Sequence, residues 1–239
     1  MSGPIRVVDL GRRRYGEVLD LQRSLCHQRL SGELTENILL LVEHEPVVTL
    51  GRGTKASSIP IPRAALEARG LEVFEVERGG DVTIHAPGQL VGYPILDLSE
   101  WRQDLHWYLR QVEEVLIRGL GTQGIPAERN PGKTGVWTRG RKIASIGIHV
   151  KQWVTLHGFA LNVTTDISLF DLIVPCGIPG VIMTSVIRER AVAASDPAAL
   201  WAETRSGLIA AFGNVFDREM VSGAAATPSL TEATAPRPG

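Results

Sequence analysis

The chain has 239 residues, of which 44% are hydrophobic and 21% are charged, as in globular proteins rather than disordered or fibrous ones. Its 25 Lys and Arg residues nearly balance 26 Asp and Glu residues, which excludes the basic excess typical of nucleic-acid-binding proteins. The longest apolar runs are too short for a membrane span, which needs about 20 residues. We therefore expect neither nucleic acid nor membrane as a partner.

The first predicted element is a helix over residues 15–30, where apolar side chains recur every three or four positions and Ser31-Gly32 provides a stop. Cys26 lies on the apolar face of this helix, so we expect it to be a small buried side chain. β-Branched and leucine residues then predict strands at 38–42, 47–50 and 71–76.

A second amphipathic helix fits residues 101–116. Two further strands are predicted at 143–150 and 154–161, joined as a hairpin near Lys151 and Gln152. The last predicted core element is a helix over residues 197–212. Strands mixed with three long helices, without regular alternation, predict an α/β (α+β) fold in which a mixed β-sheet is packed with helices.

The end of the chain differs in composition from the rest. Residues 222–239 are almost all Ala, Thr, Ser, Pro and Gly, which bury too little apolar surface to offset the entropy of ordering. We therefore expect residues 1–221 to form one domain and residues 222–239 to form a disordered tail.

The amino end lacks the charged start and apolar stretch of a signal peptide, which indicates a cytoplasmic protein. In that reducing compartment Cys26 and Cys176 are not expected to form a disulfide. The six histidines lack the spacing and the neighbouring cysteines of a zinc site, so we expect no metal.

Glycines mark two candidate binding regions. Gly79 and Gly80 follow a predicted strand, and a backbone without side chains there forms either a ligand-binding loop or an ordinary hairpin turn. Gly147 and Gly158 lie in the predicted hairpin, where they leave room either for an acyl chain or for close packing.

A cysteine and a lysine are candidates for chemistry. Cys176 lies in a Pro/Gly-rich loop, where a thiol can be exposed and a nearby cation can favour its reactive thiolate form. Lys142 alternates with Ala144 and Ile146, which predicts that the three share one strand face. A lysine at such a position either snorkels to solvent or takes part in chemistry. With Arg139 and Arg141 it forms either a small basic patch that steers acidic partners or a solvated strand end.

Four segments occur in a specific order: RGGDVTIH, RKIASIGIHV, LHGFALNV and VPCGI. Together they resemble the lipoyl(octanoyl) transferase family of lipoate biosynthesis, over roughly residues 5–187. The resemblance implies the fold of the biotin and lipoate protein ligases. It also implies an acyltransferase that moves octanoyl from acyl carrier protein to a lysine of a lipoyl domain and needs no cofactor.

The resemblance also assigns residues. The family's acyl-thioester cysteine falls on Cys176, and the lysine that favours its thiolate falls on Lys142. Backbone N–H groups around Cys176-Gly177 and in the 78–85 loop are candidates for holding the tetrahedral oxyanion. The substrate-lining stretches fall on Arg78, Gly79, Gly80, Asp81, Val82, Thr83, Ile84 and His85, on Ser145, Ile146 and Gly147, and on Gly158, Phe159 and Ala160.

The implied donor is octanoyl-acyl carrier protein. The implied acceptors are the lipoyl domains of 2-oxoacid dehydrogenase E2 subunits and the glycine cleavage H protein, served by a monomeric enzyme. Two alternatives stay open. One is an ATP-dependent lipoate–protein ligase of the same fold, which needs no cysteine nucleophile. The other is a non-catalytic acyl-carrier-binding protein, which would function unchanged after Cys176→Ala.

Overall fold

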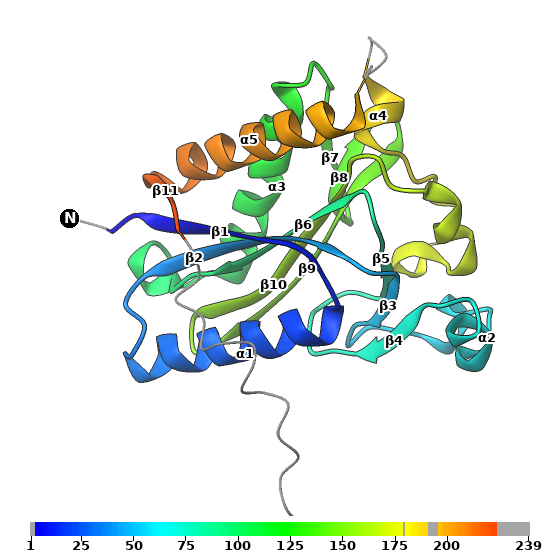
Figure 1. Cartoon of the computed structure of the whole chain (residues 1–239), viewed down its shortest axis with the longest axis horizontal. Helices are drawn as coiled ribbons and strands as arrows, with labels where there is room; N and C mark the ends of the chain where they lie inside the picture. Colours follow the sequence, from blue (N-terminus) through cyan, green and yellow to red (C-terminus); the bar gives the residue numbers. More distant parts are fainter. Residues whose placement is uncertain (1–2, 179, 191–195, 224–239) are drawn as a thin grey trace, which may run out of the picture.

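Eight strands in the order β11-β1-β2-β6-β10-β9-β8-β7 form a mixed sheet at the centre of the fold (Figure 1). The structure is a computed structural model and describes residues 3–178, 180–190 and 196–223. β1 runs parallel to β2 and β11, and the other neighbouring pairs are antiparallel. The strands are β1 (Ile5–Arg13), β2 (Asn37–His44), β6 (Gln89–Ile95), β7 (Glu128–Asn130), β8 (Lys133–Thr138), β9 (Arg141–Lys151), β10 (Val154–Asn162) and β11 (Met220–Ser222).

Helices cover both faces of this sheet (Figure 1). α1 (Tyr15–Ser31) packs on one face with apolar residues of β2, β6 and β10. α3 (Leu105–Gly121) and α5 (Pro197–Phe216) pack together on the other face over a second core cluster. The predicted mixed sheet packed with helices is therefore confirmed. Among the described residues, no helix combines the length and the apolar character that a membrane crossing requires.

A smaller sheet lies beside the main one and has its own core. Its order is β4-β3-β5, with β3 parallel to β4 and antiparallel to β5. The bounds are β3 (Val47–Leu50), β4 (Glu72–Glu75) and β5 (Val82–His85). Short helical segments complete the fold: η1 (Ala56–Ser58), α2 (Arg63–Glu67), η2 (Leu98–Glu100), η3 (Ile167–Leu172), η4 (Pro175–Gly177) and α4 (Val186–Glu189).

The long helices follow the sequence prediction closely, and their ends have local causes. α1 ends where Gly32 adopts a left-handed conformation with φ of 81°. α3 begins four residues later than predicted because Asp104 caps it: its carboxylate accepts a hydrogen bond from Trp107 N at 3.0 Å. The predicted hairpin is β9 and β10, and its turn residues, Gln152 and Trp153, both have positive φ.

The carboxyl end of the fold extends past the predicted domain boundary. Ser222 is the last residue of β11 and pairs with Val7, and Gly223 N donates a hydrogen bond to Val7 O at 3.1 Å. The prediction that the tail begins at Ser222 is therefore wrong by two residues. The rest of the predicted tail, residues 224–239, lies outside the described residues.

Candidate active site

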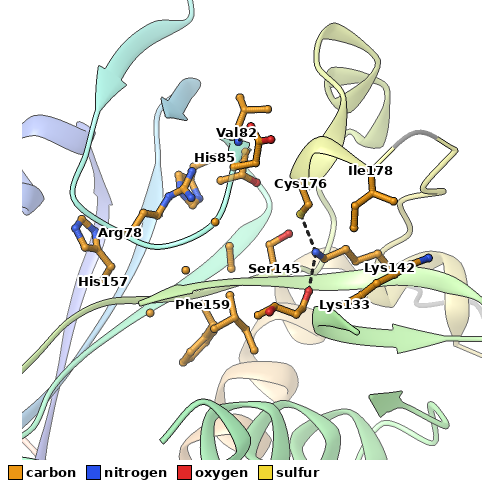
Figure 2. Close-up of a pocket in the computed structure, with 18 of the residues that line it drawn as sticks. Arg78, Val82, His85, Lys133, Lys142, Ser145, His157, Phe159, Cys176 and Ile178 are labelled. Atoms are coloured by element: carbon orange, nitrogen blue, oxygen red, sulfur yellow. Dashed lines mark hydrogen bonds between the residues drawn. The ribbon is translucent and has the colours of Figure 1, made fainter. Parts of the chain in front are cut away.

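A cavity of about 240 Å3 lies between the loops of the small sheet and strands β9 and β10 of the main sheet (Figure 2). Most of the predicted site residues meet at its wall: Arg78, Gly80, Asp81, Val82, Thr83, His85, Lys142, Ser145, Ile146, Gly147, Gly158, Phe159, Ala160 and Cys176. Gly79 and Ile84 do not line it. Ile84 is buried in the core of the small sheet, and Gly79 N donates to Ile148 O instead.

The side chains of Cys176 and Lys142 meet at one end of this cavity (Figure 2). Lys142 Nζ lies 2.8 Å from Cys176 Sγ and donates a second hydrogen bond to Thr134 O at 3.0 Å. Nζ also lies 5.6 Å from the centroid of the Trp137 ring, within range of a cation–π contact. Lys142 is only 1% exposed, whereas Cys176 is partly exposed. A buried amine is thus held beside a thiol that a ligand can reach.

Lys142 reaches the cavity because β9 is irregular at this point. Val136 of β8 pairs with Ala144, but the next residue, Trp137, pairs with Lys142, so β9 contains one extra residue. Such a bulge changes the alternation of side chains along a strand. Ala144 and Ile146 belong to the core cluster of α3 and α5, while Lys142 faces Cys176. The prediction that the three side chains share one face is therefore wrong.

The two cysteines occupy different environments. Cys26 is 3% exposed within the core under α1, as predicted, and burial raises the pKa of its thiol. Cys176 follows Pro175 in η4 and adopts a left-handed conformation with φ of 58°. Only Cys176 lines the cavity and contacts a cation.

Arg78 supplies a second cation to the cavity wall. Its Nη2 donates to Thr49 O at 2.7 Å, and its Nη1 donates to Gly79 O at 3.0 Å. Burial lowers the pKa of Arg78, yet a guanidinium stays protonated in proteins, and none of the described carboxylates forms an ion pair with it. Arg78 and Lys142 together favour negative charge on a ligand or on the thiol sulfur.

Several of the backbone amides proposed as oxyanion donors are already used within the fold. Gly177 N donates to Val174 O at 2.9 Å, and Val82 N donates to Asp81 Oδ1 at 2.7 Å. Gly79 N is bonded to Ile148 O. A developing oxyanion would need other donors than these three amides.

Three rings outside the predicted site also line the cavity, namely Tyr15, Tyr93 and His157. The remaining lining residues are Gly132, Lys133, Thr134 and Ile178. Tyr15 stacks on His85 with ring centroids 5.8 Å apart, and burial raises the pKa of Tyr15 to about 12 and lowers that of His85 to about 3. His157 is 1% exposed and has a positive φ of 56°. Its position directly before Gly158 in LHGFALNV is the one signal that could have drawn attention to it.

The structure reduces the predicted basic patch to two arginines. Arg139 and Arg141 both contact the buried Glu189 carboxylate, with Nη1–Oε2 and Nη2–Oε2 distances of 3.0 and 2.9 Å. Lys142 is buried and points to Cys176. Lys142 is therefore not part of an exposed basic patch, and the two half-exposed arginines share one carboxylate.

A family profile described as "Lipoyl protein ligase A/B catalytic domain" matches residues 14–195, which is more than half of the chain. Curated relatives named "Octanoyltransferase" align over most of its length. The one from Nostoc punctiforme is 54% identical over 66% of this chain and 67% of its own. The one from Nostoc sp. is 48% identical over 84% and 86%, and the one from Solibacter usitatus is 45% identical over 90% and 94%.

Solved structures with the same fold are more distant in sequence. A bi-partite lipoate protein ligase from Thermoplasma acidophilum superimposes with a TM-score of 0.68 at 16% identity, covering 94% of this chain and 87% of its own. A lipoate-protein ligase A bound with ATP gives a TM-score of 0.70 at 16% identity, covering 94% and 89%. At this identity the likeness concerns the fold alone, and it agrees with the lipoate-ligase fold expected from the ordered motifs.

Proposed function

The chain belongs to the lipoyl protein ligase A/B catalytic domain family, and from this premise we propose that it carries octanoyl as a thioester on Cys176 between two protein substrates. Its curated relatives at 44–54% identity are octanoyltransferases, and the chain is an octanoyltransferase, an acyltransferase of protein lipoylation. The observation that supports the covalent route is the 2.8 Å contact between Lys142 Nζ and Cys176 Sγ at the cavity wall.

In the first half-reaction, the thiolate of Cys176 attacks the thioester carbonyl of octanoyl-acyl carrier protein. The Lys142 ammonium favours that thiolate because the two groups are in direct contact. Collapse of the tetrahedral intermediate breaks the bond to the carrier's thiol, and the departing sulfur takes a proton from Lys142. The products are the acyl-enzyme, the free carrier thiol and a neutral Lys142.

In the second half-reaction, the amine of a lipoyl-domain lysine attacks the acyl-enzyme carbonyl. The neutral Lys142 accepts the proton that this amine must lose, and Cys176 leaves as a thiolate. An amide has formed, and the ammonium–thiolate pair is restored without any nucleotide or metal. Both substrates use the same cysteine in turn, which predicts ping-pong kinetics.

The partners proposed for this cytoplasmic reaction are octanoyl-acyl carrier protein as donor and, as acceptors, the lipoyl domains of 2-oxoacid dehydrogenase E2 subunits and the glycine cleavage H protein. The cavity next to Cys176 would hold the acyl chain, with Gly147 and Phe159 at its wall.

A transfer assay tests the proposal. Purified enzyme is mixed with octanoyl-acyl carrier protein and an unmodified lipoyl domain, with and without ATP, and octanoylation of the domain is followed by mass spectrometry. We expect full turnover without ATP, loss of turnover in Cys176→Ala, and unchanged turnover in the matched Cys26→Ala. A requirement for ATP would instead favour a ligase, and activity in Cys176→Ala would contradict the covalent route.

A further inference from the structure

The loop that carries Cys176 has an unusual backbone. Cys176 and Gly177 are consecutive residues with left-handed conformations, with φ of 58° and 64°. Glycine adopts this region readily, but a cysteine there persists only when its surroundings hold it. The position of the nucleophile therefore depends on groups outside its own loop.

Asp81 and Ser58 meet this loop on the side of Gly177. Asp81 Oδ2 accepts a hydrogen bond from Ser58 Oγ at 2.8 Å, and Asp81 Oδ1 accepts one from Val82 N at 2.7 Å. Both carboxylate oxygens are thus fixed. Ser58 is 2% exposed, and its carbonyl accepts a hydrogen bond from Val174 N at 2.9 Å, two residues before the cysteine.

The same two side chains lie directly against Gly177. A Cβ atom placed on Gly177 would overlap Asp81 Oδ2 and would lie 3.3 Å from Ser58 Oγ. Gly177 is therefore required here for space as well as for its φ angle. The Asp81–Ser58 pair occupies the space next to Gly177, so the backbone at Gly177 cannot move in that direction.

The other end of the same loop is tied to Lys142 itself. Lys142 N donates to Ile182 O at 2.8 Å, and Thr184 N donates to Lys142 O at 2.9 Å. The lysine thus stands at one anchor of the loop and reaches back to Cys176 Sγ. The contact at Gly177 therefore bears directly on how its neighbour Cys176 sits relative to Nζ.

We propose that Asp81 and Ser58 form a clamp that holds the Cys176–Gly177 turn in its left-handed conformation and so sets the distance between Sγ and Lys142 Nζ. This rests on the proposed function, in which Cys176 is the nucleophile. Asp81 is then a positioning residue that acts through the loop backbone, rather than the substrate contact that its place in the RGGDVTIH segment suggested.

Substitutions at Asp81 separate its geometry from its charge. In Asp81→Asn the amide oxygen can still accept from Val82 N, and the amide nitrogen can donate to Ser58 Oγ, so the clamp is kept while the charge is lost. In Asp81→Ala both are lost. Two measurements apply: the single-turnover rate of acylation by octanoyl-acyl carrier protein, and the pH profile of Cys176 alkylation by iodoacetamide in the Cys26→Ala background.

We expect Asp81→Ala to slow acylation by about tenfold or more, with little change in the KM for the donor, because misplacement of a reacting group lowers rate rather than binding. The alkylation profile should move to higher pH as the sulfur leaves Nζ. The acylation rate of Asp81→Asn should stay within about threefold of wild type. Adding Ser58→Ala to Asp81→Ala should slow acylation little further, because both substitutions remove the same contact. Asp20→Ala on the exposed face of α1 is the matched control.

If Asp81→Ala is acylated at the wild-type rate and alkylated with the wild-type pH profile, the proposed clamp is contradicted. An Asp81→Asn variant that is acylated as slowly as Asp81→Ala would also contradict it, because that result would show that the charge of Asp81 matters rather than its hydrogen bonds. If wild type itself is not acylated, the proposed function fails, and the alkylation profile still tests the clamp. If Asp81→Ala does not fold, the same two measurements on Asp81→Asn and Ser58→Ala test the clamp.

Discussion

Lys142 changes its charge during the proposed cycle, and its surroundings suit both forms. As an ammonium it donates to Cys176 Sγ and to Thr134 O. As a neutral amine it can keep the bond to Thr134 O, which leaves its lone pair free to accept a proton. In the proposed cycle the residue therefore acts as an amine that gains and loses a proton, and not only as a fixed positive charge.

Lys142→Arg separates these two roles. Arginine keeps the positive charge, but it stays protonated at any working pH and cannot accept a proton from the acceptor lysine. The site is also crowded, since a Cβ on Gly135 would come within 2.8 Å of Lys142 Cε. We expect slow acylation and a further loss of about a hundredfold or more in amide formation. Rapid-quench measurement of the two half-reactions checks this.

The matched control for Lys142→Arg is Lys151→Arg, at the exposed end of the same strand. This variant should leave both half-reactions unchanged. If Lys142→Arg slows acylation and amide formation by the same factor, the proton-accepting role is contradicted, and charge alone would account for the residue.

At the level of elements, the two glycines of the β9–β10 hairpin, Gly147 and Gly158, have different surroundings. A Cβ on Gly158 would overlap the backbone oxygen of Gly92 in β6 and lie 2.7 Å from Pro94 Cδ. A Cβ on Gly147 would meet the Arg78 side chain at 2.8 Å and Gly79 O at 3.0 Å, at the cavity wall. Gly158 thus serves close packing between strands, while Gly147 keeps space next to Arg78.

Alanine at each glycine should therefore have a different effect. We expect Gly158→Ala to lower the free energy of unfolding by about 1–3 kcal/mol, because the fixed backbone of β6 cannot yield. Gly147→Ala should cost less stability and raise the KM for octanoyl-acyl carrier protein, because the Arg78 side chain must move into the cavity. Urea unfolding and steady-state kinetics measure the two effects. Equal destabilisation with unchanged KM would show that both glycines only serve packing.

Elements with a clear local pattern could be predicted, and those that depend on distant partners could not. Regular apolar spacing or β-branched runs mark helices α1, α3 and α5 and strands β2, β3, β4, β9 and β10. β7 and β11 are three residues long, so they contain too little sequence for a pattern. β11 exists because β1 pairs with it from the other end of the chain.

The candidate site likewise combines residues that the sequence identifies with contacts that it does not reveal. The ordered motifs identify Cys176 and Lys142, but the bulge in β9 that turns Lys142 toward the cysteine leaves no mark in the sequence. The contacts of Thr134 with Lys142 and of Ser58 with Asp81 join segments that are 8 and 23 residues apart. Such contacts follow from tertiary packing, and no local pattern encodes them.

At the scale of the whole molecule, the two ends of the described chain are joined through β1 and β11. Ile5 N donates to Glu219 O at 2.8 Å, and Gly223 N donates to Val7 O. The composition of residues 224–239 predicts no packed role for them, so we expect their deletion to change neither turnover nor Tm. Deletion from residue 220 should lower Tm, by about 2–4 °C for each kcal/mol lost with β11. A fall in turnover after the shorter deletion would contradict this.

Buried histidines make the stability of the molecule depend on pH. Burial lowers the pKa of His44 to about 4, while its Nδ1 donates to Arg13 O at 3.1 Å and its Nε2 accepts from Tyr93 Oη at 2.8 Å. Between the unfolded pKa of about 6.5 and this lower folded value, only the unfolded chain binds the proton. The contribution of His44 is therefore complete above pH 6.5 and is lost as the pH falls toward 4.

We expect protonation of His44 in the unfolded chain to lower the free energy of unfolding by about 2 kcal/mol as the pH falls from 7.5 to 5. His44→Gln can keep both hydrogen bonds without titrating, so its stability should depend less on pH over this range. Urea denaturation of both proteins at the two pH values measures the difference. Parallel pH dependences in wild type and His44→Gln would show that His44 does not contribute.

Covalent attachment of octanoyl to Cys176 is tested most directly by intact-mass spectrometry of the enzyme after incubation with octanoyl-acyl carrier protein alone. We predict a mass increase of one octanoyl group in wild type and in Cys26→Ala, its removal by hydroxylamine, and no increase in Cys176→Ala. Wild type that transfers octanoyl to a lipoyl domain but never gains this mass, or Cys176→Ala that still gains it, would contradict the covalent route.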